Sequence, residues 1–144
     1  VGLELDFWKI SMRPGKPLIF GHIGDTPILG LPGNPVSATV CALIYLGPAI
    51  GAMLGLRDGA TPMASAVLGC DLEANDERQD YLRSALLPGP DGTLVATPSK
   101  AQDSSMFATL AHADCLVVRA PHAPPARTGD VVSIVPLDGS ILSI

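Results

Sequence analysis

Alternating hydrophobic and polar positions mark the first recognisable segment, residues 7–13. A period of two predicts a half-buried β-strand, because successive side chains of a strand point to opposite faces. The apolar face would carry Trp8, Ile10 and Met12, and the polar face Lys9, Ser11 and Arg13. Two apolar runs follow at 18–23 and 26–31, separated by Gly24-Asp25, and this spacing predicts a β-hairpin.

A long uncharged stretch comes next, with no charged residue between Asp25 and Arg57. Asn34 is a favoured N-cap and Pro35 is favoured at the first helical position, so the sequence predicts that a helix begins there. The apolar run 36–56 is long enough to span a bilayer. Gly47-Pro48 interrupts it and no cationic flank precedes it. We therefore expect a buried helix and no membrane partner, with a membrane-anchored fragment as the alternative.

The second half of the chain has the pattern of a small β domain. Short apolar runs at 64–70, 79–87, 94–97, 115–119 and 131–137 are separated by Gly, Pro and Asp, which predicts five strands. Residues 105–111 have helical spacing of apolar side chains and predict one short helix. Five strands and one helix suggest a small barrel or sandwich. A polar break at 57–62 reads as the junction between the two halves.

Composition narrows the class of protein. Hydrophobic residues make up 47% of the 144 residues and the net charge is -5, so an ordered core is expected and sequence-independent nucleic-acid binding is disfavoured. Cys41, Cys70 and Cys115 lie among apolar neighbours without a zinc-binding spacing, so we expect buried free thiols in a reducing compartment. The chain begins at Val1 and has no signal-peptide pattern, and we expect a fragment of a longer polypeptide.

Three cations follow one another closely near the start of the chain. On a strand, Lys9 and Arg13 would share a face with their Cα atoms roughly 13 Å apart. Lys16 comes just after the predicted turn at Pro14-Gly15. Cations at this spacing suit an extended polyanion such as a pyrophosphate group. The alternative is that they are ordinary surface cations, which is the usual place for Lys and Arg.

The segment 31–37 turns a predicted strand sharply into a helix N-terminus. Gly33 lets a ligand approach the backbone, and the N–H groups of Val36, Ser37 and Ala38 would be free to meet an anion where the helix dipole favours one. Simple helix capping explains the same residues without a ligand. Arg78 and Arg83 lie in an acidic stretch that is typical of a solvated face.

These motifs together resemble the molybdopterin molybdenumtransferases, a family shared with the C-terminal domain of gephyrin. The resemblance is carried by FWKISMRPGKP at 7–17 and LPGNPVSA at 31–38, with weaker matches at 77–83, 102–106, 116–118 and 128–131. It implies α/β followed by mostly β: residues 1–57 as the C-terminal part of a three-layer α/β molybdopterin-binding domain, 58–62 as a linker and 63–144 as a β-barrel domain.

The resemblance also implies an activity, the insertion of molybdate into adenylylated molybdopterin with release of AMP. Lys9 and Arg13 correspond to active-site cations, although Arg13 departs from the usual Lys. Arg78 and Ser104 match positions that the β-domain offers across a dimer interface, and Asp103 replaces the Gly usual before that serine. The other residues predicted to bind substrate are Lys16, Pro32, Gly33, Asn34, Pro35 and Ser37.

The remaining expectations come from the same family. Its members use Mg²⁺, whose ligands we expect in upstream sequence rather than in this chain. The expected partners are adenylylated molybdopterin, molybdate and a second copy in a homodimer, and the expected location is the cytoplasm. This piece should be inactive alone, because much of the site would come from upstream segments. The alternative is a scaffold of the gephyrin type that has kept the fold without the chemistry.

Overall fold

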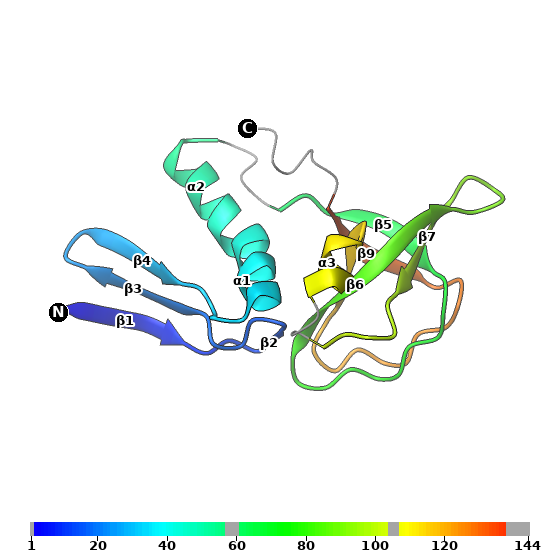
Figure 1. Ribbon diagram of the computed structural model, residues 1–144, viewed down its shortest axis with the longest axis horizontal. Helices are drawn as coiled ribbons and strands as arrows, with labels where there is room; N and C mark the ends of the chain where they lie inside the picture. The colour runs from blue at the N-terminus through cyan, green and yellow to red at the C-terminus, as the bar shows by residue number, and fades with distance from the viewer. Residues whose placement is uncertain (1, 57–60, 104–106, 138–144) are drawn as a thin grey trace.

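The computed structural model describes residues 2–56, 61–103 and 107–137. A three-stranded sheet with a helix over it lies beside a barrel that carries one short helix (Figure 1). The elements are β1 (Leu3–Trp8), β2 (Met12–Arg13), β3 (Ile19–Ile23), β4 (Thr26–Gly30), α1 (Pro35–Cys41), the π-helical η1 (Ala42–Leu46), α2 (Gly47–Met53), β5 (Ala64–Leu68), β6 (Gln79–Pro88), β7 (Leu94–Pro98), α3 (Phe107–Ala111), β8 (Cys115–Arg119) and β9 (Val131–Pro136).

The first sheet has the order β1-β3-β4 and is antiparallel throughout. β3 and β4 form the predicted hairpin around Gly24-Asp25, with Ile23 paired to Thr26. Gly21 faces β1 so closely that a Cβ atom there would lie 2.2 Å from the backbone oxygen of Glu4. A side chain at this position would therefore push the two strands apart.

The predicted single strand over 7–13 is wrong. β1 ends at Trp8, and Lys9 adopts a positive φ of 67° that turns the chain out of the sheet. The backbone N–H of Lys9 donates to Leu18 and that of Ile10 to Lys16, which closes a loop. The chain then pairs again as β2, parallel to β6 of the barrel. Lys9 and Arg13 thus lie in different surroundings and do not share a strand face.

The helix begins as predicted. The Asn34 side chain accepts hydrogen bonds from Val36 and Ser37, and Pro35 is the first helical residue. The helical segment Pro35–Met53 continues past Gly47-Pro48 through a π-helical stretch, in which the Gly47 N–H donates to the Ala42 carbonyl. Its 19 residues are long and apolar enough to cross a membrane, and only 28% of its most apolar stretch is buried within this chain. The predicted burial of the whole helix is therefore not seen within this chain, and the absence of a membrane partner stays a prediction.

The second part is a closed barrel of five strands. The order is β6-β7-β5-β9-β8, and β8 also pairs with β6 to close the sheet. All five predicted strands are present, and β5 and β7 form the one parallel pair among the described barrel strands. The predicted helix 105–111 is seen as α3, while its first two residues lie outside the described part. The predicted fold class, α/β followed by a small β-barrel, is confirmed.

One hydrophobic core joins the two parts. Buried side chains that precede the polar break pack with buried side chains of the barrel and of α3. Its members are Met12, Leu18, Val36, Val40, Cys41, Tyr81, Leu110, Leu116 and Val135. A second cluster fills the barrel itself, around Leu68, Ala96, Val117 and Ile134. Residues 57–60 of the predicted junction lie outside the described part, and the domain boundaries stay a prediction.

The cysteines partly follow expectation. Cys41 and Cys115 are fully buried, and burial raises the pKa of each thiol to about 11, so both are neutral at physiological pH. Cys70 differs from the prediction, because it is partly exposed. All three are free thiols.

Candidate oxyanion-binding site

Three cations lie on the loop that leaves the first sheet and returns to it, residues 9–18. Hydrogen bonds from Lys9 to Leu18, from Ile10 to Lys16 and from Leu18 to Gly15 hold this loop. The Arg13–Pro14 peptide bond is cis. The loop is anchored on one side by β3 and on the other by the pairing of β2 with β6. It therefore brings Arg13 and Lys16 to the junction between the first sheet and the barrel.

A cleft of about 340 Å³ opens at this junction. Its lining from the first part is Met12, Arg13, Pro14, Gly15, Lys16, Pro17 and Ser37, and from the barrel Arg78 and Gln102. Four residues predicted from sequence, Arg13, Lys16, Ser37 and Arg78, therefore meet in one hollow. Three of them are cations, and the chain as a whole has a net charge of -5. Cationic side chains thus gather in the cleft although the chain as a whole is acidic, and two of the three are paired with Asp76 and Asp80.

The three cations differ in how far they are already neutralised. Arg13 hydrogen-bonds to both Asp80 and Asp76. Arg78 donates to Asp76 through one terminal nitrogen, while no described atom accepts from its buried Nε. Lys16 is exposed and makes no ion pair with a described residue. Lys16 is therefore the exposed donor left for a ligand, while the Nε of Arg78 is a second donor without a described acceptor but is buried.

The helix N-terminus does not supply the predicted free donors. The N–H groups of Val36 and Ser37 donate to Asn34 Oδ1 at 3.1 and 3.2 Å, and that of Ala38 donates to the Asn34 backbone oxygen. The cap thus competes with an anion for the same groups, and the prediction that they are free is wrong. Of the predicted loop residues, Pro32, Gly33, Asn34 and Pro35 do not line the cleft; Ser37 does.

Lys9 stands apart from the cleft lining. Its ammonium lies 4.0 Å from the centre of the exposed Trp8 ring, a cation–π contact. Its positive φ is unusual for a residue with a side chain. Such backbone strain is found more often where a side chain has a functional task. Lys9 therefore stays a candidate site residue, although it lies outside the cleft itself.

Sequence reasoning missed Arg83. This side chain is 1% exposed, and no described atom accepts a hydrogen bond from its Nε. Burial lowers the pKa of the guanidinium, and the charge of Asp103 opposes that shift. Arg83 interrupts a strand whose neighbours are mostly apolar, which is the sequence signal that could have singled it out. A terminal nitrogen of Arg83 donates to the Asp103 backbone oxygen at 3.3 Å, so the guanidinium is partly satisfied, and its unpaired Nε makes this position a second candidate for anion contact.

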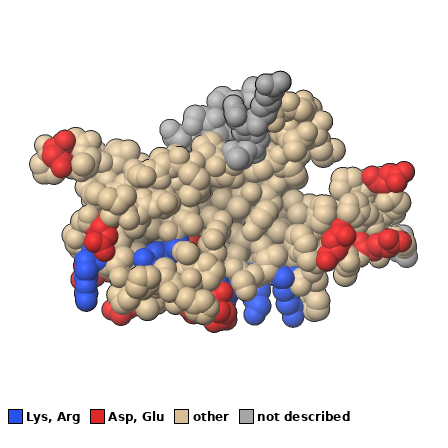
Figure 2. All heavy atoms as spheres, turned by 180° about the vertical axis from the view of Figure 1, so that it is seen from behind, with Lys and Arg blue, Asp and Glu red and all other residues tan. Residues whose placement is uncertain are grey.

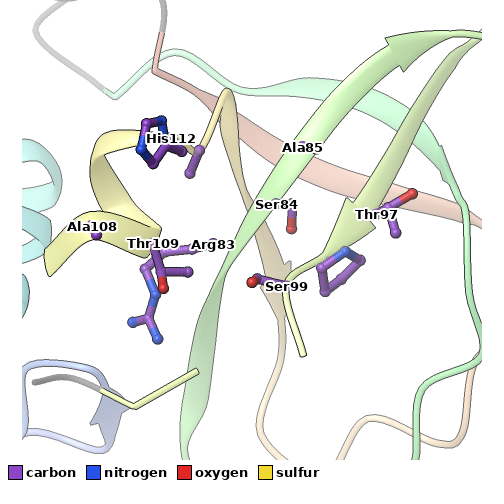
Figure 3. Close-up of a pocket in the computed structure, with 10 residues that line it drawn as sticks. Arg83, Ser84, Ala85, Thr97, Ser99, Ala108, Thr109 and His112 are labelled. Atoms are coloured by element: carbon purple, nitrogen blue, oxygen red, sulfur yellow. The ribbon is translucent and has the colours of Figure 1, made fainter. Parts of the chain in front are cut away.

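Arg83 lines a pocket of about 440 Å³ between the barrel and α3 (Figure 3). Its lining mixes alanine and proline side chains with the polar side chains of Ser84, Thr97, Ser99 and Thr109, and with His112 at the helix. Gln102 links this pocket to the first cleft, because its side chain bonds to the backbone of Arg83 and Ser99 while the residue also lines the cleft. Ser104, the other predicted barrel residue, lies outside the described part.

The charged surface agrees with a local site rather than a broad basic face. Figure 2 shows basic side chains along one edge of the molecule, with acidic side chains close beside them. A polyanion such as nucleic acid needs a wider unbroken positive surface than this face offers. A small oxyanion needs only a few donors that converge, which the cleft supplies.

The class of protein is defined by its architecture, an α/β segment followed by a closed five-stranded barrel, with cations at the junction of the two. Comparison with known proteins identifies the family within this class. The family model described as "MoeA C-terminal region (domain IV)" matches residues 65–137, and "Probable molybdopterin binding domain" matches residues 1–52. The chain belongs to the MoeA family, and its place is in molybdenum cofactor biosynthesis.

Relatives cover nearly all of the chain. The molybdopterin molybdenumtransferase of Haemophilus influenzae is 29% identical over 94% of this chain and 34% of its own length. Molybdopterin molybdenumtransferase 1 of Mycobacterium tuberculosis is 34% identical over 91% of this chain and 32% of its own. The crystal structure of a molybdopterin biosynthesis MoeA protein from Pyrococcus horikoshii has a TM-score of 0.77, with 25% identity, and covers 96% of this chain and 33% of that one. This chain thus spans about a third of the relatives it matches.

Proposed function

We propose that the complete product of the native gene inserts molybdate into adenylylated molybdopterin and releases AMP, in the cytoplasm and as a homodimer. The observation that carries this proposal is the cleft, where Arg13, Lys16 and Arg78 converge with Ser37 in an otherwise acidic chain. Molybdate is a tetrahedral dianion, and charge-assisted hydrogen bonds from Lys and Arg are the strong way to hold one.

The cleft would bind and orient the oxyanion. Lys16 supplies an exposed ammonium, and Arg78, whose buried Nε–H has no described acceptor, supplies a guanidinium to the lining. Lys9, on the same loop but outside the cleft, would meet the phosphate end of a longer ligand. Cations fixed in this way stabilise the negative charge that develops as the bond to AMP breaks. Arg83 would be the cation that the barrel pocket offers, to this site or to that of a partner subunit.

The family's Mg²⁺ calls for a set of carboxylate ligands. Within residues 2–56, 61–103 and 107–137, no group of three or more His, Cys, Asp or Glu side chains lies together as metal ligands would. The acidic residues beside the cleft, Asp76 and Asp80, are engaged with arginine. The described residues therefore do not fit a carboxylate-ligated Mg²⁺, and upstream ligands stay a prediction.

Molybdate binding tests the proposed site. We expect calorimetric titration of the complete gene product to give saturable binding, and Lys16→Ala to weaken it at least about tenfold, because hydrogen bonds to charged groups contribute about 1.5–3 kcal/mol. Arg127→Ala is the matched control, since Arg127 is a surface cation bound to Asp71 outside the cleft. An unchanged dissociation constant for Lys16→Ala would contradict the site. The scaffold alternative predicts no molybdate binding in the unaltered protein.

A further inference from the structure

Arg13 is bound to the barrel by a fork of hydrogen bonds. Its Nε donates to Asp80 Oδ1 at 2.9 Å, one terminal nitrogen donates to Asp80 Oδ2, and the other donates to Asp76 at 3.1 Å. Asp76 in turn accepts from Arg78 at 3.0 Å. The four side chains form one network across the junction, with Arg13 as the member from the first part. The backbones of Arg13 and Asp80 are also paired, where β2 meets β6.

This network differs from an ordinary surface ion pair. Asp80 is 5% exposed, so its charge is removed from water and depends on Arg13 for compensation. Both carboxylate oxygens of Asp80 are engaged, and such two-point contacts fix direction as well as distance. A lysine, with a single ammonium, could not hold both oxygens and Asp76 in the same arrangement. For comparison, the bridge between Asp71 and Arg127 is exposed on both sides.

We propose that Arg13 is a positioning residue: through Asp80 and Asp76 it fixes the barrel against the first sheet and so sets the shape of the cleft, rather than holding the oxyanion itself. The same network orients Arg78, because Asp76 binds both arginines. Lys16 from one side and Arg78 from the other then face the ligand at a fixed separation. This assignment rests on the proposed oxyanion site. The attachment of the barrel to the first sheet through Arg13, Asp80 and Asp76, called the clamp below, can be tested without that site.

Asp80→Asn, in the complete gene product, gives opposite results under the two roles. If Arg13 contacts the ligand, removing a neighbouring negative charge frees it and molybdate binds more tightly. If Arg13 acts as the clamp, the substitution lets the two sides of the cleft shift relative to each other. Molybdate binding then weakens between about ten- and a hundredfold, which is the usual effect of small misplacements of binding groups. Asp71→Asn, the control carboxylate outside the cleft, should leave the dissociation constant unchanged.

The orientation of the two parts supplies a readout that needs no ligand. Spin labels at Asp25→Cys, in the β3–β4 turn, and Leu87→Cys, on the exposed face of β6, report their separation in a Cys70→Ser background. We expect Asp80→Asn, and also Arg13→Lys, which keeps the charge, to broaden the distance distribution. A distribution as narrow as that of the unaltered protein in both variants overturns the clamp.

The two measurements separate the two proposals. If the unaltered protein does not bind molybdate, the proposed site fails, while broadened distances in Asp80→Asn still support the clamp. If the unaltered protein binds molybdate and Asp80→Asn binds it equally or more tightly, the positioning role of Arg13 is wrong and the oxyanion site stands.

Discussion

Replacing Lys9 with alanine is expected to lower molybdenum cofactor synthesis by the complete gene product at least about a hundredfold, which is the usual effect of removing one preorganised donor to developing negative charge. Lys9 is held in a strained backbone conformation, with its ammonium against Trp8. The measurement is the activity of a molybdenum-dependent enzyme in a strain that lacks the transferase. Lys100→Ala, an exposed lysine that lines neither pocket, is the control.

A second substitution at the same position separates function from folding. Glycine adopts positive φ without strain, so Lys9→Gly should be at least as stable as the unaltered protein. We expect it to be as inactive as Lys9→Ala, because both lack the ammonium. Full rescue of cofactor synthesis by Lys9→Ala would rule out the cation role.

Leu18→Ala is expected to lower the free energy of unfolding by about 2–5 kcal/mol, the range for large-to-small substitutions in a packed core. Leu18 is completely buried and belongs to the core that the first part and the barrel share. Urea unfolding of the complete gene product measures the loss. Leu87→Ala, which is 65% exposed, should change stability by no more than about 0.5 kcal/mol. A loss below about 1 kcal/mol for Leu18→Ala would mean that the shared core does not hold the two parts together.

Local patterns predicted most elements of the fold. The hairpin around Gly24-Asp25, the helix start at Asn34 and the five barrel strands each have a signal within a few residues. The end of β1 before Lys9 had no such local signal. Hydrophobic alternation continues through 7–13, although β2 leaves the first sheet and pairs with β6, more than sixty residues away. Alternation records which side chains are buried and does not record the sheet in which they are buried.

The site was predictable in its members more than in their roles. Sequence alone selected Arg13, Lys16, Ser37 and Arg78, and the structure brings these into one cleft. The prediction from sequence assigned the helix N–H groups to a ligand, even though Asn34, a recognised cap, competes for them. The ion pairs of Arg13 with Asp80 and Asp76 could not be foreseen, because they depend on how the two parts meet. Arg83 was assigned to a solvated face because the number of nearby acidic residues outweighed its place within a buried strand.

A crystal structure of the complete gene product soaked with tungstate tests the central claim most directly, because tungsten scatters anomalously and reports the position of a tetrahedral oxyanion. We predict one strong anomalous peak in the cleft, within hydrogen-bonding distance of Lys16, and a clearly weaker peak there in the Lys16→Ala protein at the same soak concentration. An empty cleft in the unaltered protein, or a peak of unchanged height in Lys16→Ala, would contradict an oxyanion site at the junction of the first sheet and the barrel.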